Sequence, residues 1–196
     1  MFTGIVQATS LLVRVSADSV EIALPEPFRG RLRVGGSVAV NGACLTARSV
    51  DERAFAADIS RETRNRTTFS ALRQGARVNL ELPVAPDRGL DGHWVLGHVD
   101  AVGRVRALYR DGAGWSLVVA HPAAGRRYVV DKGSIAVDGI SLTPFDVDED
   151  SFRCAVIPET HEATTLRDRR PGDPVNLEYD VLAKYVERMI GRVRTD

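Results

Sequence analysis

Two segments of this chain carry nearly the same eleven residues: GSVAVNGACLT at positions 36–46 and GSIAVDGISLT at positions 133–143. Shifting the sequence along itself by 97 positions aligns residues 36–81 with 133–178 without a gap, and 21 of those 46 aligned pairs are identical. Both copies end alike, with VNLE at 78–81 and at 175–178. The similarity indicates a duplicated structural unit.

The length of the repeat predicts two small domains in tandem. Solenoid and propeller repeats span about 20 to 50 residues, so a unit of nearly 100 residues should have a core of its own. We expect one unit at residues 1–86 and a second at 93–180. The segment 83–92, PVAPDRGLDG, has the proline and glycine content of a linker between them.

Short runs of apolar or alternating residues predict an all-β fold. In the first unit these runs lie at 3–8, 11–15, 20–24, 37–40, 44–50, 54–59 and 77–82. The pairs Asn41-Gly42 and Asp138-Gly139 favour tight hairpin turns, because these residue types tolerate positive φ. About six strands per unit favours a small closed barrel.

The pattern changes after Tyr179 to the period of an amphipathic helix, which we expect at residues 181–193 with Asp180 as its cap. Its apolar stripe consists of Val181, Leu182, Tyr185, Val186, Met189 and Ile190. A single helix beside two barrels has no obvious partner within the chain. The stripe therefore predicts packing against other copies, in an oligomer whose contacts this helix makes.

Composition excludes several classes of protein. The chain has 26 basic and 26 acidic residues and only 6% aromatics, which argues against a nucleic-acid-binding barrel and against an anionic membrane surface. Cys44 and Cys154 are too few and too far apart for a disulfide framework or a metal site. The N-terminus does not resemble a signal peptide, and no apolar run reaches the length of a membrane span. We expect a cytoplasmic protein without a metal.

Six motifs, in order, resemble the riboflavin synthase α-chain family over essentially the whole chain. They are MFTGIV at 1–6, NGACLT at 41–46, GHWVLGHVD at 92–100, KGSIAVDGISLT at 132–143, IPET at 157–160 and NLEYDVLAKYVERM at 176–189. The resemblance implies two tandem six-stranded Greek-key β-barrels plus a C-terminal α-helix. It also implies a homotrimer, with each active site between the N-terminal barrel of one subunit and the C-terminal barrel of another, and it makes a lumazine synthase capsid a candidate partner.

The activity implied by the resemblance is a dismutation. Two molecules of 6,7-dimethyl-8-ribityllumazine exchange a four-carbon unit and give riboflavin and 5-amino-6-ribitylaminouracil, without a cofactor. Two similar binding domains suit a reaction between two copies of one molecule, because holding both reactants in register can supply about 7 to 11 kcal/mol of the barrier reduction.

Residues that differ between the repeats are candidates for giving the two substrate molecules different chemical roles. Cys44 stands opposite Ser141 and His98 opposite Ile5. The Cys44 thiolate could add to the electron-poor C7 of a lumazine, or the thiol could only hydrogen-bond the ring; a buried apolar role is the alternative. His98 is a candidate acid or base near neutral pH, or else a structural histidine.

Two further residues have open roles. Asp180 could orient a water molecule or the ribityl chain, assist proton transfer, or cap the helix. Lys132 could bind a ribityl hydroxyl or be a solvated loop charge. With Ser141, whose hydroxyl can donate to or accept from a pteridine edge, the predicted catalytic set is Cys44, His98, Ser141 and Asp180.

The resemblance also implies substrate-binding residues in both repeats. In the first repeat and its leading segment they are Gly4, Ile5, Val6, Ser37, Cys44, Leu45, Thr46, Asp58, Ile59, Ser60, Arg61, Glu62 and Thr63. In the second they are Gly97, His98, Val99, Lys132, Ser141, Leu142, Thr143, Ile157, Pro158, Glu159, Thr160, His161 and Glu162.

The chain departs from the family pattern in three places: Asp91-Gly92 replaces Gly-Gly, Thr143 is followed by Pro144-Phe145, and the C-terminal helix is short. The principal alternative function is that of the lumazine proteins, which share the fold and carry a lumazine or flavin chromophore without catalysis. Those proteins have a degraded second repeat, whereas GSIAVDGISLT and His98 are present here. A divergent enzyme acting on a modified lumazine is a further alternative.

Overall fold

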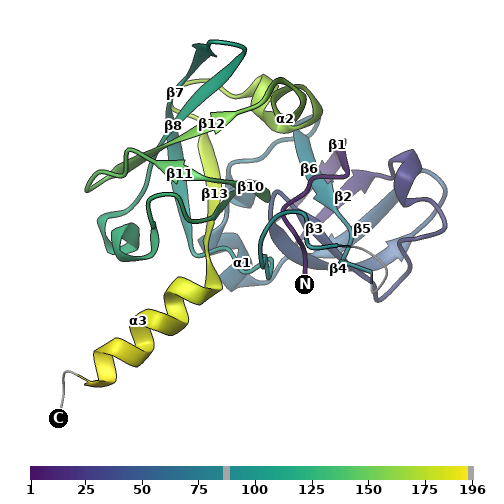
Figure 1. Ribbon diagram of the computed structural model, residues 1–196. Coiled ribbons are helices and arrows are strands. Elements are labelled where there is room, and N and C mark those ends of the chain that lie inside the picture. Colours follow the sequence, from purple (N-terminus) through teal and green to yellow (C-terminus); the bar gives the residue numbers. More distant parts are fainter. Residues whose placement is uncertain (86–88, 194–196) are drawn as a thin grey trace.

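The computed structural model describes residues 1–85 and 89–193 of the chain. Two β-sheet bodies lie against each other, and helix α3 (Val181–Val193) extends away from the second one (Figure 1). The predicted boundary at residue 86 and the middle of the predicted 83–92 linker lie outside the described residues. Within the described part, no helix is both long and apolar enough to cross a bilayer.

The first repeat is a closed antiparallel barrel. Its strands are β1 (Ala8–Val15), β2 (Ser19–Ala23), β3 (Ser37–Val40), β4 (Ala43–Val50), β5 (Ala54–Asp58) and β6 (Arg77–Glu81). They pair in the order β1-β2-β5-β4-β3-β6. The meander β3-β4-β5 with β6 returning beside β3 is a Greek-key arrangement, as predicted. Short helices η1 (Glu26–Phe28), α1 (Arg61–Arg66) and η2 (Thr68–Ser70) fill the connections.

The second repeat follows the same path. Its strands are β7 (Ala101–Asp111), β8 (Gly114–Ala120), β9 (Ile135–Val137), β10 (Ile140–Leu142), β11 (Pro144–Phe145), β12 (Ser151–Val156) and β13 (Pro174–Tyr179). Its short helices are η3 (Ala123–Tyr128), α2 (Pro158–Ala163) and η4 (Thr165–Asp168). Helix α2 is the counterpart of α1.

The second sheet differs from the predicted closed six-stranded barrel. It has seven strands in the order β10-β9-β13-β7-β8-β12-β11, with β10 and β11 at opposite ends. These two short strands together correspond to β4 of the first repeat. Pro144 begins β11 and lacks the N–H needed to continue a ladder, and Asp146 follows at φ 48°. The strand that would close the sheet is therefore broken into two pieces, one on each edge.

Each repeated segment is a hairpin, as predicted. The turn residues Asn41 and Gly42 have φ of 45° and 78°, and Asp138 and Gly139 have 48° and 77°, which is typical of a type I′ turn. The two turns meet back to back: a Cβ placed on Gly42 would lie 2.7 Å from the Gly139 nitrogen, and the reverse distance is the same. Only glycines allow this contact.

Each repeat has its own apolar core. The first is built around Phe28 and Phe55, and the second around Leu117 and Phe152. A smaller cluster, formed by Phe2, Ala39, Val95 and Ala136, belongs to both repeats and lies where they meet.

Buried asparagines join the two repeats with reciprocal hydrogen bonds. The Asn79 side chain accepts from the Thr165 N–H at 2.8 Å and donates to the Asp138 carbonyl at 2.9 Å. Asn176 does the same in the opposite direction, accepting from the Thr68 N–H and donating to the Asn41 carbonyl, both at 2.8 Å. The repeats are therefore related by an approximate twofold arrangement about the touching hairpin turns.

The segment that leads into each repeat contacts the hairpin of the other repeat. Cys44 N–H donates to the Gly97 carbonyl, and Ser141 N–H donates to the Gly4 carbonyl, both at 2.8 Å. The segment at 3–7 is thus an extended crossing piece and not the first barrel strand that its apolar pattern predicts. Phe2 pairs with Val95 where the two crossing pieces meet.

A buried glutamate anchors each crossing piece to its own repeat. Glu81 accepts hydrogen bonds from the Thr3 and Gly4 N–H groups at 2.7 and 3.0 Å. Glu178 accepts from the Leu96 and Gly97 N–H groups at 2.7 and 2.9 Å. Burial raises the pKa of both carboxyls, although these backbone donors act in the opposite direction.

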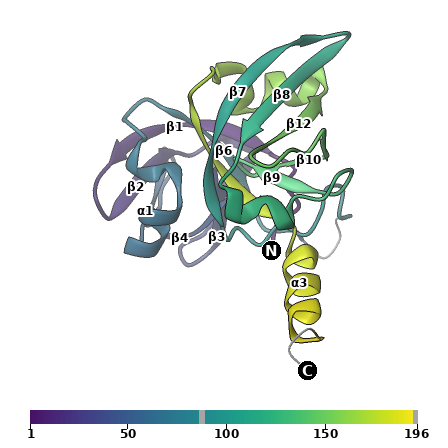
Figure 2. The same cartoon turned by 90° about the vertical axis from the view of Figure 1, so that its left-hand side faces the viewer.

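Helix α3 begins at Asp180, whose side chain accepts from the Leu182 N–H at 2.9 Å, as the capping prediction requires. Ion pairs Lys184–Asp100 (2.6 Å) and Glu187–Arg127 (2.8 Å) tie one face of the helix to the second repeat. Figure 2 shows the rest of the helix standing clear of both sheets. Its exposed apolar residues are Leu182, Tyr185, Val186, Met189 and Ile190.

Candidate functional site

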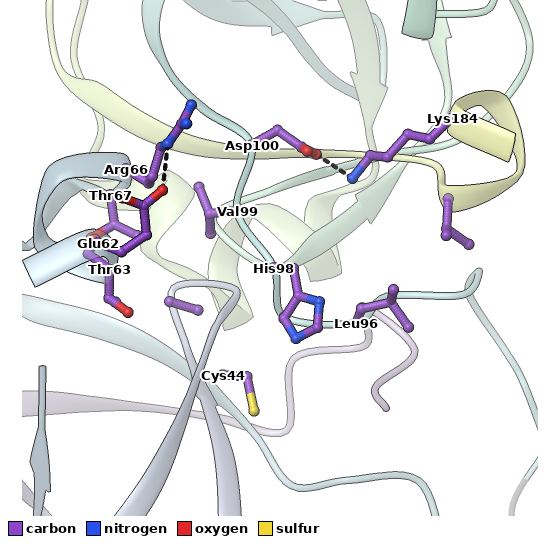
Figure 3. A pocket seen from close by; sticks show the side chains of 13 residues that line it. Cys44, Glu62, Thr63, Arg66, Thr67, Leu96, His98, Val99, Asp100 and Lys184 are labelled. Atoms are coloured by element: carbon purple, nitrogen blue, oxygen red, sulfur yellow. Dashed lines mark hydrogen bonds and ion pairs between the residues drawn. The ribbon is translucent and has the colours of Figure 1, made fainter. Parts of the chain in front are cut away.

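The first candidate site, here called the Cys44 pocket, is a cavity of about 550 Å³ between the repeats. Its walls come from the β3–β4 hairpin, helix α1, the segment at 96–100 and the first turns of α3 (Figure 3). The lining residues are Ala43, Cys44, Glu62, Thr63, Arg66, Thr67, Leu96, Gly97, His98, Val99, Asp100, Val181 and Lys184.

Gly97 brings the two candidate catalytic residues of this pocket together. Its φ is 81°, and a Cβ there would lie 2.5 Å from the Cys44 Cβ, so the crossing piece can approach the hairpin only through a glycine. The next residue, His98, then faces the same space as Cys44 (Figure 3). Cys44 is a half-buried free thiol, and a ligand in the cavity could reach both groups.

Two ion pairs line other parts of the Cys44 pocket. Arg66 and Glu62 pair at 2.9 Å on helix α1, whose N-terminus is capped by the Ser60 hydroxyl accepting from the Thr63 N–H. Lys184 and Asp100 pair at 2.6 Å, and Asp100 also accepts from the Tyr179 N–H at 2.8 Å. The charges balance, so the pocket suits a neutral, hydrogen-bonding ligand better than a strongly charged one.

The second candidate site, here called the Ser141 pocket, is the corresponding cavity of the second repeat, about 540 Å³ in volume. It is lined by Lys132, Ser141, Leu142, Thr143, Phe145, Ala155, Val156, Ile157 and Thr160. Ser141 occupies the place of Cys44, and its N–H is held by Gly4 just as that of Cys44 is held by Gly97.

A histidine that the sequence analysis did not select lies beside Ser141. The His93 Nδ1 is 2.7 Å from the Ser141 Oγ, and only 6% of the residue is exposed. Burial lowers the pKa of His93, and the Asp180 carboxylate opposes that shift. Burial therefore favours the neutral form of His93, whose ring contacts the hydroxyl that corresponds to the Cys44 thiol.

The pockets bring together part of the predicted site. Cys44, Glu62, Thr63, Gly97, His98 and Val99 line the first, and Lys132, Ser141, Leu142, Thr143, Ile157 and Thr160 line the second. Gly4 lies directly against Ser141. Neither lining includes Ile5, Val6, Ser37, Leu45, Thr46, Asp58, Ile59, Ser60, Arg61, Pro158, Glu159, His161, Glu162 or Asp180.

Several of these outlying residues have other partners. Asp58 pairs with Arg48 at 2.8 Å. The His161 ring stacks in parallel on Trp115, with centroids 3.9 Å apart. Asp180 caps α3, and it acts on His93 through its charge.

Other pocket residues lie outside the centres of the repeated motifs and were not among the predicted site residues. Arg66, Asp100, Lys184 and Phe145 are the clearest of them. Lys184 was one of only two lysines in the chain, and Phe145 stood at a departure from the family pattern, so both carried a signal. Within residues 1–85 and 89–193, no group of three or more His, Cys, Asp or Glu is placed to hold a metal ion.

Comparison with known proteins agrees with the duplication of the binding unit. The model of the lumazine binding domain matches the chain twice, at residues 3–83 and 96–180. A riboflavin synthase of Mycobacterium bovis is 44% identical, covering 97% of this chain and 98% of that protein. Riboflavin synthases of Photobacterium phosphoreum (36% identical) and Bacillus subtilis (34%) also cover 97% of this chain, and 89% and 90% of their own lengths.

Solved structures support the fold. LumP complexed with riboflavin superposes with a TM-score of 0.84 at 24% identity, covering 91% of this chain and 99% of LumP. LumP complexed with 6,7-dimethyl-8-(1'-D-ribityl) lumazine gives 0.83 at 22% identity, with the same coverage. With two matched lumazine-binding repeats and full-length relatives at 34–44% identity, the chain belongs to the riboflavin synthase family of lumazine-binding proteins.

Proposed function

We propose that this protein is a riboflavin synthase that joins two molecules of 6,7-dimethyl-8-ribityllumazine by four-carbon transfer, the last step of riboflavin biosynthesis. The observation that carries the proposal is the pair of equivalent pockets with unlike polar groups. Cys44 and His98 line one pocket, whereas Ser141 and Lys132 line the other, with His93 buried against the Ser141 hydroxyl. A reaction in which one molecule donates carbons and its twin accepts them requires such a difference.

The proposed chemistry needs one base and well-placed partners. The C7 methyl of a lumazine is acidic because its anion is delocalised into the ring, so a modest base suffices. His98 is exposed within the Cys44 pocket and suited to that proton transfer. Cys44 either adds to C7 as a thiolate or hydrogen-bonds the ring.

In the second pocket, Ser141 holds the other lumazine, and the buried ring of His93 orients the Ser141 hydroxyl. The donor leaves as 5-amino-6-ribitylaminouracil once its C6 and C7, together with their two methyl groups, have joined the acceptor, so carbon is balanced without a cofactor. Donor and acceptor are not assigned to particular pockets.

The active site is proposed to form between subunits of a homotrimer. The support is the exposed apolar face of α3, whose Tyr185 and Met189 are 66% and 69% exposed; a contiguous stripe of that kind is typical of a surface that binds another protein. Residues 181–193 would be the oligomerisation helix, with the binding units at 1–86 and 93–180. The Cys44 pocket of one subunit would then face the Ser141 pocket of another.

Partners and location complete the proposal. The small-molecule substrate and product are the principal partners, and a lumazine synthase capsid is a further candidate. Both cysteines are free, in keeping with a reducing cytoplasm.

Chromophore binding without catalysis is the second candidate function, because the LumP structures share the fold. The decisive experiment mixes the purified protein with 6,7-dimethyl-8-ribityllumazine alone and follows lumazine absorbance against riboflavin formation. One riboflavin for every two lumazines consumed is the expected result. Tight lumazine binding with no riboflavin would instead assign the protein to the chromophore carriers.

A further inference from the structure

Lys132 and Phe145 form a pair in the Ser141 pocket that the Cys44 pocket lacks. The Lys132 Nζ lies 4.7 Å from the centre of the Phe145 ring, within the range of a cation–π interaction, and both residues line the cavity. The equivalent positions of the first repeat hold Gly35 and Arg48. Neither residue of the pair therefore has a chemical counterpart there.

The backbone fixes this pair. Lys132 has φ of 60°, a left-handed conformation that is unfavourable for a residue other than glycine. Its N–H donates to the Pro144 carbonyl at 2.8 Å, which ties the lysine loop to the short strand β11 that carries Phe145. Strand β11 in turn pairs with β12, where Phe145 faces Arg153. The break at Pro144 thus places an aromatic ring under the lysine.

Among the residues that the structure describes, the charged groups near Phe145 do not form ion pairs with Lys132, so its ammonium interacts with the aromatic ring. Arg153 also approaches Phe145, at 5.8 Å, but it is paired with Asp146 at 3.3 Å. Lys132 makes no ion pair with any residue in the described ranges, so the ring is the group that orients its ammonium. An ammonium has three donors and no acceptor, which suits the hydroxyls of a ribityl chain or a ring carbonyl.

We propose that Phe145 is a positioning residue that holds the Lys132 ammonium toward the ligand of the Ser141 pocket and so makes the two pockets unequal in lumazine affinity. The proposal rests on the proposed function for the identity of the ligand. The proposed role of Phe145 is to orient the lysine. The first repeat has a glycine, Gly35, at the position of Lys132 and therefore has no equivalent ammonium to orient.

A double-mutant cycle tests this role. Phe145→Leu keeps an apolar side chain but removes the aromatic face, and Phe145→Tyr keeps the face. From the usual strength of an exposed cation–π pair, Phe145→Leu is expected to raise KM for lumazine about twofold to fivefold with kcat little changed. Phe145→Tyr is expected to retain the wild-type KM.

The cycle is completed in a Lys132→Met background, where Phe145→Leu is expected to have no further effect on KM. An equal KM increase with and without the lysine would show that the ring touches the ligand directly and would overturn the proposal. An unchanged KM in the Phe145→Leu variant would overturn it too. Thermal melting of each variant verifies that it is folded.

Equilibrium dialysis with lumazine separates this proposal from the proposed function. The expected result is two classes of site per chain, with Phe145→Leu weakening one class and Phe145→Tyr weakening neither. If the wild-type protein bound lumazine but formed no riboflavin, the proposed function would fail while the dialysis cycle still decided the role of Phe145. Equal weakening of both classes in Phe145→Leu would contradict the proposal.

Discussion

His98 and Ile5 each follow a glycine with positive φ in the two crossing pieces, at 81° for Gly97 and 78° for Gly4. The two residues therefore occupy equivalent positions along the backbone and differ in their side chains. A histidine at this place gives the Cys44 pocket an imidazole that can act in proton transfer. The isoleucine at the equivalent place beside Ser141 offers no such group.

Replacing His98 with alanine is expected to lower kcat on the order of a hundredfold, the usual contribution of a general acid or base. Lumazine binding, measured by dialysis, should change much less, because the cavity keeps its other walls. Stopped-flow assays of riboflavin formation measure kcat. The matched variant Ile5→Ala removes a side chain from the equivalent position of the other repeat and should leave the proton-transfer step intact. An unchanged kcat for His98→Ala would remove this histidine from the chemistry.

His93 makes a second prediction, about stability and pH. Because burial depresses its pKa below the ordinary value of 6.5, the unfolded chain binds a proton more readily than the folded chain as the pH falls. The contribution of neutral His93 to stability is therefore complete above the unfolded-state pKa and is lost as pH falls through the folded-state pKa.

His93→Gln, which cannot titrate, should lose less stability than the wild type between about pH 7.5 and about pH 5. Urea unfolding at the two pH values measures how much the free energy of unfolding falls in each protein. Subtracting the variant's loss from the wild-type loss removes the contribution of the carboxylates, which both proteins share. Equal losses in both proteins would show that His93 titrates alike in the folded and unfolded states.

At the scale of elements, the crossing pieces and hairpins fit together through glycines, and two of these glycines provide a matched test. Gly97 and Gly75 have nearly the same φ, 81° and 82°. A Cβ at Gly75 would meet no atom within 4 Å, whereas one at Gly97 would lie 2.5 Å from the Cys44 Cβ. The pair separates the conformational cost of alanine from the cost of a steric clash.

Gly75→Ala is expected to lower the free energy of unfolding by roughly 1 to 2 kcal/mol, the cost of positive φ alone. Gly97→Ala should cost more, and it should also reduce lumazine binding because the crossing piece must move away from the hairpin. Chemical denaturation and dialysis measure the two effects. If both variants were equally stable, the space between Gly97 and Cys44 would be large enough for a Cβ, in contradiction to the structure.

Local patterns predicted many of these elements, and their failures have a physical explanation. The turns at Asn41 and Asp138 and the helix after Asp180 depend on neighbouring residues, so the sequence predicts them correctly. Alternation at residues 3–8 reports only that the segment is extended. Whether it joins its own barrel or crosses to the other repeat depends on distant Glu81 and Ser141.

The candidate site shows the same limit. Cys44, His98 and Ser141 were predicted because they differ between aligned repeats. His93 lies before the aligned region and contacts Ser141 only because the crossing piece carries it there. Pro144 was noticed as a departure, but its effect of dividing a strand between two sheet edges depends on the whole strand order.

At the scale of the whole molecule, the two cores are separate but the buried polar groups are shared. Asn79 and Asn176 each place two hydrogen bonds across the boundary, and both are at most 2% exposed. An unpaired buried group costs about 1 to 3 kcal/mol. These bonds therefore couple the folding of one repeat to the folding of the other.

Wild-type protein is expected to unfold in a single transition, and the double variant Asn79→Ala with Asn176→Ala in two. Each single variant should cost about 2 to 6 kcal/mol, because two partners lose their hydrogen bonds, and the approximate twofold arrangement predicts similar losses for both. Calorimetry measures the transitions. A double variant that still melted in one step would indicate that the apolar cluster around Phe2 and Val95 is sufficient for coupling.

The back-to-back contact of Gly42 with Gly139 also bears on how this molecule can evolve. Two separate subunits encoded by one gene and meeting at such a twofold axis would carry the same residue on both sides, so a thiol gained in one cavity would be gained in the other. Joined in one polypeptide, the halves mutate independently while the contact between them is kept. The thiol facing His98 and the hydroxyl facing His93 are differences that two identical subunits from one gene could not carry.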